Sequence, residues 1–259
     1  MPALDSVLRR DRAIVGAALL AITLAAWLYL FRLSAMMPGM DLPDMPGMAM
    51  LRDHPWEVVD VLLLFVMWTV MMMAMMVPAA TPMVLTFAAV QRKRREQERA
   101  TVPTVVFLLG YAVVWTTYAA AAALAQWRLH EAQLLSAAMA STSARLGGAL
   151  LLAAGAFQWT RLKEVCLSKC RSPLSFVMSE WREGRAGAVV MGVRHGAYCV
   201  ACCWALMALL FVAGVMNLWW IAGLAVFVLA ERVLPGGQAV SRIGGALLLL
   251  AGAVILVRG

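Results

Sequence analysis

Seven long apolar runs constrain the fold of this chain more than any other feature. They cover residues 13–31, 58–87, 103–125, 145–161, 187–214, 217–231 and 243–257. A helix needs about 20 apolar residues to cross a bilayer, and within lipid a helix satisfies its own backbone hydrogen bonds. The runs therefore predict an all-α fold, a polytopic transmembrane helical bundle of about seven spans.

The charged residues support this interpretation and orient the spans. Only 14% of the 259 residues are charged and 63% are hydrophobic. This composition provides too few polar residues to cover the surface of a water-soluble globule. The net charge of +8 comes from Lys and Arg between the runs, so it indicates topology and no nucleic-acid partner. A cytoplasmic N-terminus leaves few basic residues outside: Arg32, Arg52, Arg128, Arg145 and Arg258. We expect the C-terminus outside, provided that a turn at 214–217 separates two spans.

The apolar runs also suggest a domain organisation. The first run ends in aromatic residues and Arg32, as a retained span does at the interface, so residues 1–34 are expected to form an N-terminal span. Residues 35–57 form a Met-rich external loop, and residues 58–259 form a membrane domain of about six spans.

A sequence repeat lies within this membrane domain. Residues 145–156, RLGGALLLAAGA, nearly match residues 242–253, RIGGALLLLAGA, in runs of opposite direction. This pattern fits a three-plus-three inverted repeat, a design common in transporters. Convergence gives the same pattern, since small residues favour close packing of membrane helices.

The run at 187–214 carries a histidine and three of the five cysteines. On a helix, Met191, His195, Cys199 and Cys202 fall within an arc of about 80°, with Cys203 about 40° beyond. Thiol and imidazole ligands suit copper(I) and are compatible with zinc, whereas Mg²⁺ and Ca²⁺ prefer oxygen. Cysteine also packs as a small hydrophobe, but ionisable groups within a span are usually functional.

The run at 58–87 adds a second sulfur-rich surface and two prolines. Its methionines lie at helical spacing and should reach the depth of the cysteines, although methionine also fills gaps in apolar cores. The candidate ligands among them are Met71, Met72, Met75 and Met76. Pro78 and Pro82 free backbone carbonyls, which can face a cavity or be satisfied in a structural bend.

Two further sulfur motifs lie toward the aqueous ends. The external loop contains MPGM twice, which offers Met37, Met40, Met45 and Met48 for metal capture, because thioethers bind copper(I) without losing a proton. On the cytoplasmic side, Cys166 and Cys170 stand among basic residues, whose field is expected to lower the thiol pKa. All five cysteines lie near the reducing side, so structural disulfides are not expected.

Three segments of the chain resemble a known bacterial family. MMMAMMVPAATPM, QWTRLKEVCLSKCRSP and GVRHGAYCVACCWALMALLFVAGVMNL are similar to segments of the predicted metal-binding integral membrane proteins, a domain of unknown function sometimes labelled copper chaperone. The resemblance covers roughly residues 58 to 257. It implies copper as the metal and assigns the binding residues to Cys166, Cys170, His195, Cys199, Cys202 and Cys203, with the methionines of the second run.

These observations predict a protein that binds, transfers or transports copper(I) in the bacterial inner membrane. The expected partners are the metal ion, membrane lipid and a cuproprotein or copper chaperone. The chain has no phosphate-binding loop, and we expect no enzymatic activity. The alternative is a membrane thiol-disulfide oxidoreductase that uses Cys199 with Cys202 and Cys166 with Cys170. A third hypothesis is a scaffold in which these residues only pack.

Overall fold

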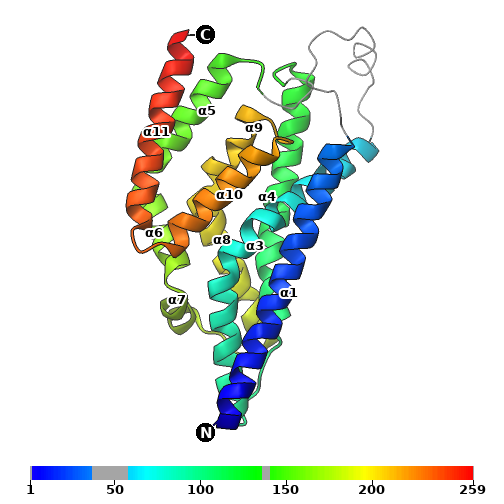
Figure 1. Cartoon of the computed structure of the whole chain (residues 1–259), viewed down its shortest axis with the longest axis vertical. Helices are drawn as coiled ribbons and strands as arrows, with labels where there is room; N and C mark the ends of the chain where they lie inside the picture. Colours follow the sequence, from blue (N-terminus) through cyan, green and yellow to red (C-terminus); the bar gives the residue numbers. More distant parts are fainter. Residues whose placement is uncertain (1, 37–57, 136–140, 259) are drawn as a thin grey trace.

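The protein is an elongated bundle of helices, as the apolar runs predict (Figure 1). A computed structural model describes residues 2–36, 58–135 and 141–258. Its long helices are α1 (Pro2–Ala35), α3 (Val58–Glu96), α4 (Thr104–Glu131), α8 (Gly184–Ala208) and α11 (Gly237–Arg258). The shorter helices are α5 (Ala144–Phe157), α6 (Arg161–Arg171), α7 (Pro173–Glu180), α9 (Leu210–Ala213) and α10 (Leu218–Val233). The Met-rich external loop lies outside the described residues.

Among the described residues, five helical segments are long and apolar enough to cross a membrane. They are Arg12–Ala35, Val58–Glu96, Thr104–Glu131, Gly184–Ala213 and Gly237–Arg258. The runs at 145–161 and 217–231 form the shorter helices α5 and α10. The turn predicted at 214–217 is present, with Gly214 at φ 94° and Asn217 capping α10 through Trp220 N–H. The two chain ends lie at opposite ends of the long axis (Figure 1).

Local signals in the sequence set several of the helix ends. Ser143 caps α5 through Leu146 N–H, and Thr160 caps α6 through Lys163 N–H. Pro173 occupies the first turn of α7, where its missing N–H costs nothing. α6 and α7 follow α5 at the side of the bundle, where α6 packs against α8 (Figure 1).

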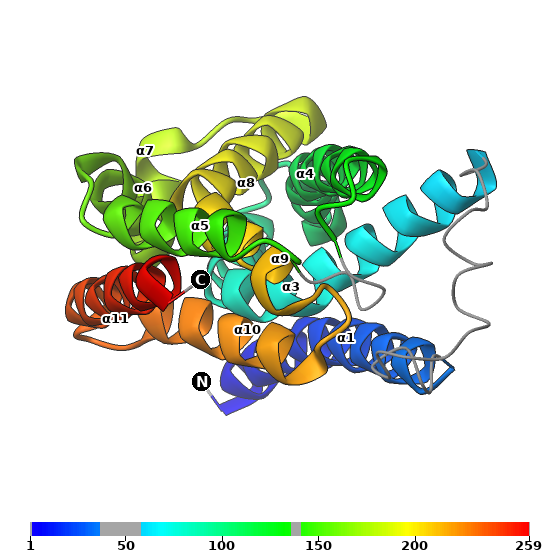
Figure 2. The same cartoon turned by 90° about the horizontal axis from the view of Figure 1, so that it is seen from above.

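The sequence repeat forms a reciprocal pair of helices. α5 and α11 pack along each other over most of the length of α5 (Figure 2). A Cβ on Gly252 would lie 2.9 Å from Gly148 O, and a Cβ on Gly155 would lie 2.9 Å from Gly245 O. The shift of 97 residues that relates the repeats exchanges these two contacts. The repeated glycines are therefore where the two backbones approach most closely, while the three-plus-three extension stays a prediction.

Candidate metal site

The site is positioned by a close crossing of α4 and α8. A Cβ on Gly192 would lie 3.1 Å from the Cα of Gly110 and would collide with the carbonyl of Phe107. Only glycine permits this approach of the two backbones. It brings Tyr111, the next residue of α4, against the sulfur-bearing face of α8.

Three thiols of α8 and one of α6 form a buried cluster. Cys199 and Cys203 are fully buried, and Cys202 is only 1% exposed. The Cys202 and Cys203 thiols both donate to Cys199 O, at 3.1 and 2.9 Å. Cys170 of α6 is also buried, and its thiol is hydrogen-bonded to Cys202. We call Cys170, Cys199, Cys202 and Cys203 the thiol cluster.

A guanidinium group lies at the centre of the thiol cluster. Arg232, near the end of α10, is 6% exposed, and its Nη2 lies 3.0 Å from Cys199 Sγ, 3.3 Å from Cys202 Sγ and 3.8 Å from Cys203 Sγ. Within the described residues Arg232 forms no ion pair with a carboxylate. Within the part of the chain that the structure describes, the three sulfur atoms are therefore the groups placed to interact with this buried cation.

Arg232 was not predicted as a site residue, because an arginine at the end of an apolar run resembles the basic residues that orient spans. The signal that points to it is the pair Glu231-Arg232 at the end of an apolar run, where two ionisable residues must be exposed or paired. Both side chains are buried.

Tyr111 and His195 extend the site along α8. The Tyr111 Oη lies 3.1 Å from Cys199 Sγ and donates to Met76 O at 3.2 Å. The His195 ring is 1% exposed and packs between Phe107 and Tyr111, with ring centroids 6.1 and 5.6 Å away. Neither ring nitrogen of His195 has a hydrogen-bond partner in the described part of the chain. His195 is therefore a buried imidazole, one turn from Cys199, whose ring nitrogens are candidate metal ligands.

The two cysteines of α6 occupy a different environment from the predicted one. Both are buried, at 4% for Cys166 and 7% for Cys170. Burial raises the pKa of the Cys166 thiol, and the hydrogen bond to Cys202 together with burial raises the pKa of Cys170. The expectation that basic neighbours lower both pKa values is therefore wrong, because the hydrogen bond to Cys202 and burial raise the pKa of Cys170, and burial raises the pKa of Cys166.

Four of the eight predicted methionine ligands lie within the described residues, and the other four lie outside them. Met71, Met72, Met75 and Met76 are all buried in the core beside α4, and α3 continues through both prolines. Met76 is tied to the thiol cluster through its backbone carbonyl and Tyr111. Met37, Met40, Met45 and Met48 lie outside the described residues.

The thiol cluster is not arranged around a metal-sized space of conventional geometry. Across residues 2–36, 58–135 and 141–258, no group of three or more His, Cys, Asp and Glu side chains is placed to hold an ion. The guanidinium of Arg232 lies where the sulfur atoms converge. A four-ligand zinc site is therefore disfavoured, whereas a softer ion that needs fewer ligands is compatible with a pair of thiolates beside the guanidinium.

A family model described as copper chaperone (PpoB2) matches residues 65–255, which contain the thiol cluster, Arg232, Tyr111 and His195. No curated protein and no solved structure matches the chain.

Proposed function

The chain belongs to the copper chaperone family, and from this premise we propose that it binds copper(I) at the thiol cluster and passes it on within the bacterial inner membrane. Copper is the cargo and not a resident cofactor. The proposal places the N-terminus in the cytoplasm, where the excess of Lys and Arg favours it.

The observation that carries this proposal is the convergence of three buried thiols, Cys199, Cys202 and Cys203, on one guanidinium. Thiolates are soft ligands that select copper(I), but a pair of thiolates around a monovalent ion leaves one uncompensated negative charge. Arg232 supplies the opposite charge at 3.0 and 3.3 Å from Cys199 and Cys202. A copper(I) bis-thiolate beside Arg232 is therefore electrically neutral as a unit, which is the condition for burying it at low cost.

The positions of the remaining sulfur residues suggest a route. Methionines of the external loop would collect copper(I), and the buried methionines of α3 would lead it toward α8. Cys170 connects the cluster to α6, where Cys166 stands one turn earlier. A cytoplasmic cuproprotein or copper chaperone would exchange metal at that helix. Either direction of movement uses the same ligands.

The test is anaerobic purification in detergent, followed by elemental analysis of copper and zinc. We expect about one copper per chain, lost in a Cys199→Ser, Cys202→Ser double variant. Cys166→Ser is the matched control, because Cys166 lies outside the thiol cluster, and it should keep its copper. Bound copper that is unchanged in the double variant would contradict the proposal, provided that both proteins give the same elution profile and melting temperature.

A thiol oxidoreductase is the second candidate, favoured by the contact between Cys170 and Cys202 from two different helices. This function requires the pair to form a disulfide during turnover. Mass mapping of thiols after mild oxidation separates the candidates, because a Cys170 to Cys202 disulfide that re-forms after reduction supports redox chemistry. Metal binding instead requires both thiols to stay reduced.

A further inference from the structure

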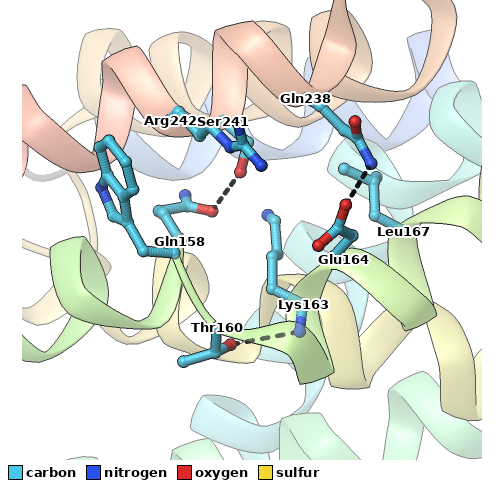
Figure 3. A pocket seen from close by; sticks show the side chains of 9 residues that line it. Gln158, Thr160, Lys163, Glu164, Leu167, Gln238, Ser241 and Arg242 are labelled. Atoms are coloured by element: carbon cyan, nitrogen blue, oxygen red, sulfur yellow. Dashed lines mark hydrogen bonds between the residues drawn. The ribbon is translucent and has the colours of Figure 1, made fainter.

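An open hollow lies on the surface at the turn from α10 to α11. Its volume is about 470 Å³, and it is lined by Arg171 of α6, by Pro235 and Gly236 of the turn, and by Arg242 of α11. We call this hollow the arginine pocket. A smaller polar pocket adjoins it, because Gln238 and Arg242 line both spaces (Figure 3).

The guanidinium of Arg171 is held against the first turn of α11. Its Nη2 donates to Leu234 O at 2.7 Å and to Pro235 O at 2.9 Å. A Cβ on Gly237 would lie 2.6 Å from Arg171 Nη1, so the guanidinium lies directly against the start of the helix. No other acceptor binds this guanidinium within the described residues, and its Nε and Nη1 therefore remain available to a ligand.

The positive charge at this turn exceeds the negative charge around it. Neither Arg171 nor Arg242 forms an ion pair within the described residues. α11 has no acidic residue in its first turn, where unbonded N–H groups give a helix a partial positive charge. Glu231 is paired with Lys163 at 2.7 Å, and Glu164, which accepts a hydrogen bond from α11 at 2.9 Å, balances at most one of the two arginines. The arginine pocket therefore attracts an anion.

A buried donor in the smaller pocket independently indicates an oxygen-bearing ligand. Gln158 is 4% exposed, and its Oε1 accepts a hydrogen bond from Ser241 at 2.9 Å (Figure 3). Its Nε2 has no acceptor within the part of the chain that the structure describes, although buried polar atoms are nearly always satisfied. The smaller pocket has about 30 Å³ of space, enough for about two water molecules at roughly 10–15 Å³ each. Water there would connect Gln158 to ligand oxygens in the arginine pocket.

An exposed apolar stripe of α11 begins at the arginine pocket. Ile243 lines the pocket, and Leu247, Leu250 and Val254 follow it on the same face of the helix. These four side chains are 47–64% exposed. The 22 residues of α11 give a length of about 33 Å, enough to cross the hydrocarbon core, so the first turn of α11 lies at the membrane–water interface. The stripe therefore offers apolar surface to an acyl chain next to the pocket.

We propose that the arginine pocket binds the phosphate group of an anionic phospholipid, whose acyl chains lie along the apolar stripe of α11. The phosphate oxygens accept hydrogen bonds from Arg171, Arg242 and the free N–H groups at the start of α11. A zwitterionic lipid also carries a phosphate, but its own ammonium group offsets the attraction of the two arginines, so an anionic headgroup is preferred. This site lies outside the proposed function, because it involves no thiol and no copper.

The test is native mass spectrometry of the full-length protein in detergent, with equal amounts of phosphatidylglycerol and phosphatidylcholine that carry the same acyl chains. Arg242→Gln removes one charge from a side chain that makes no hydrogen bond or ion pair within the described residues, so this variant should fold. Arg171→Gln removes the other charge together with the contacts to the turn. Arg185→Gln is the matched control, because Arg185 is exposed on α8 and does not line the pocket. A second arm adds inorganic phosphate at constant ionic strength.

We expect the unaltered protein and the control to retain one phosphatidylglycerol per chain, with a preference over phosphatidylcholine of about tenfold. Arg242→Gln and Arg171→Gln should each lower this preference about fivefold, the effect of one arginine near a membrane surface. Equal retention of the two lipids by the unaltered protein, or an unchanged preference in folded Arg242→Gln, would overturn the site. Displacement of the lipid by millimolar inorganic phosphate would overturn the lipid assignment, because the apolar stripe would then contribute nothing. None of these readouts involves copper, so they are separate from the test of the proposed function.

Discussion

Removing the charge of Arg232 while keeping a polar side chain should weaken copper(I) binding strongly. In Arg232→Gln the copper bis-thiolate would retain its negative charge without a counter-charge. At a separation of about 4 Å and an effective dielectric constant of about 20, the lost interaction is about 4 kcal/mol. Since 1.4 kcal/mol corresponds to a factor of ten, the dissociation constant for copper(I) should rise about 100- to 1000-fold. The lower figure applies if water enters beside the shorter Gln side chain and partly screens the charge.

The assay is anaerobic competition for copper(I) against a chromophoric chelator at neutral pH. Arg232→Lys preserves the charge and should lose much less copper affinity than Arg232→Gln. Some loss is expected, because the Lys ammonium lacks the planar guanidinium that contacts several thiols at once. Arg185→Gln, at an exposed position of α8, is the control for a general loss of positive charge. If folded Arg232→Gln competes as well as the unaltered protein, the charge argument is refuted.

Three further predictions concern neighbouring groups. His195→Phe keeps the aromatic packing with Phe107 but removes the nitrogens, so copper affinity in the same competition assay should fall about tenfold with no loss of melting temperature. Lys163→Met leaves Glu231 buried and unpaired, which should lower the free energy of unfolding by about 3–5 kcal/mol in denaturant titrations, whereas Lys163→Met with Glu231→Leu should recover most of it. Because burial raises the pKa of Cys166, the folded protein keeps this thiol neutral at pH 8, and its alkylation at that pH should be slower than that of free cysteine. Alkylation should accelerate only above the ordinary thiol pKa near 9. The contribution of the neutral thiol to folding stability should decline over the same pH range.

The sequence predicted what depends on local pattern. Apolar length predicted the helices, and the spacing of Cys199 and Cys202 predicted a shared face, which the structure buries. Helical periodicity also placed Met71 and Met75 together, and the structure buries both. Whether any of these sulfur atoms binds a metal stays a prediction.

The remainder of the site depends on contacts between distant segments, which no local pattern specifies. Tyr111 reaches Cys199 only because Gly110 and Gly192 let two backbones approach, and sequence gives no pairing of α4 with α8. In the sequence, Arg232 at the end of an apolar run fits the pattern of basic residues that orient spans, so its charge alone could not indicate burial. For Cys166, the basic residues nearby in sequence predicted a lowered thiol pKa. Burial raises that pKa instead.

The arrangement of charges also explains why the cluster is placed beside a second ion pair. If Glu231 were free, it would neutralise the adjacent Arg232, and the thiols would lose the cation that favours their charged forms. Lys163 prevents this by holding Glu231 Oε2 at 2.7 Å. Lys163 therefore affects the sulfur atoms indirectly, because its ion pair with Glu231 leaves Arg232 free to interact with them. A Lys163→Met variant should accordingly weaken copper binding even though Lys163 contacts no thiol, and restoration of that affinity by Glu231→Leu would attribute the effect to the competition between Glu231 and the thiolates for Arg232.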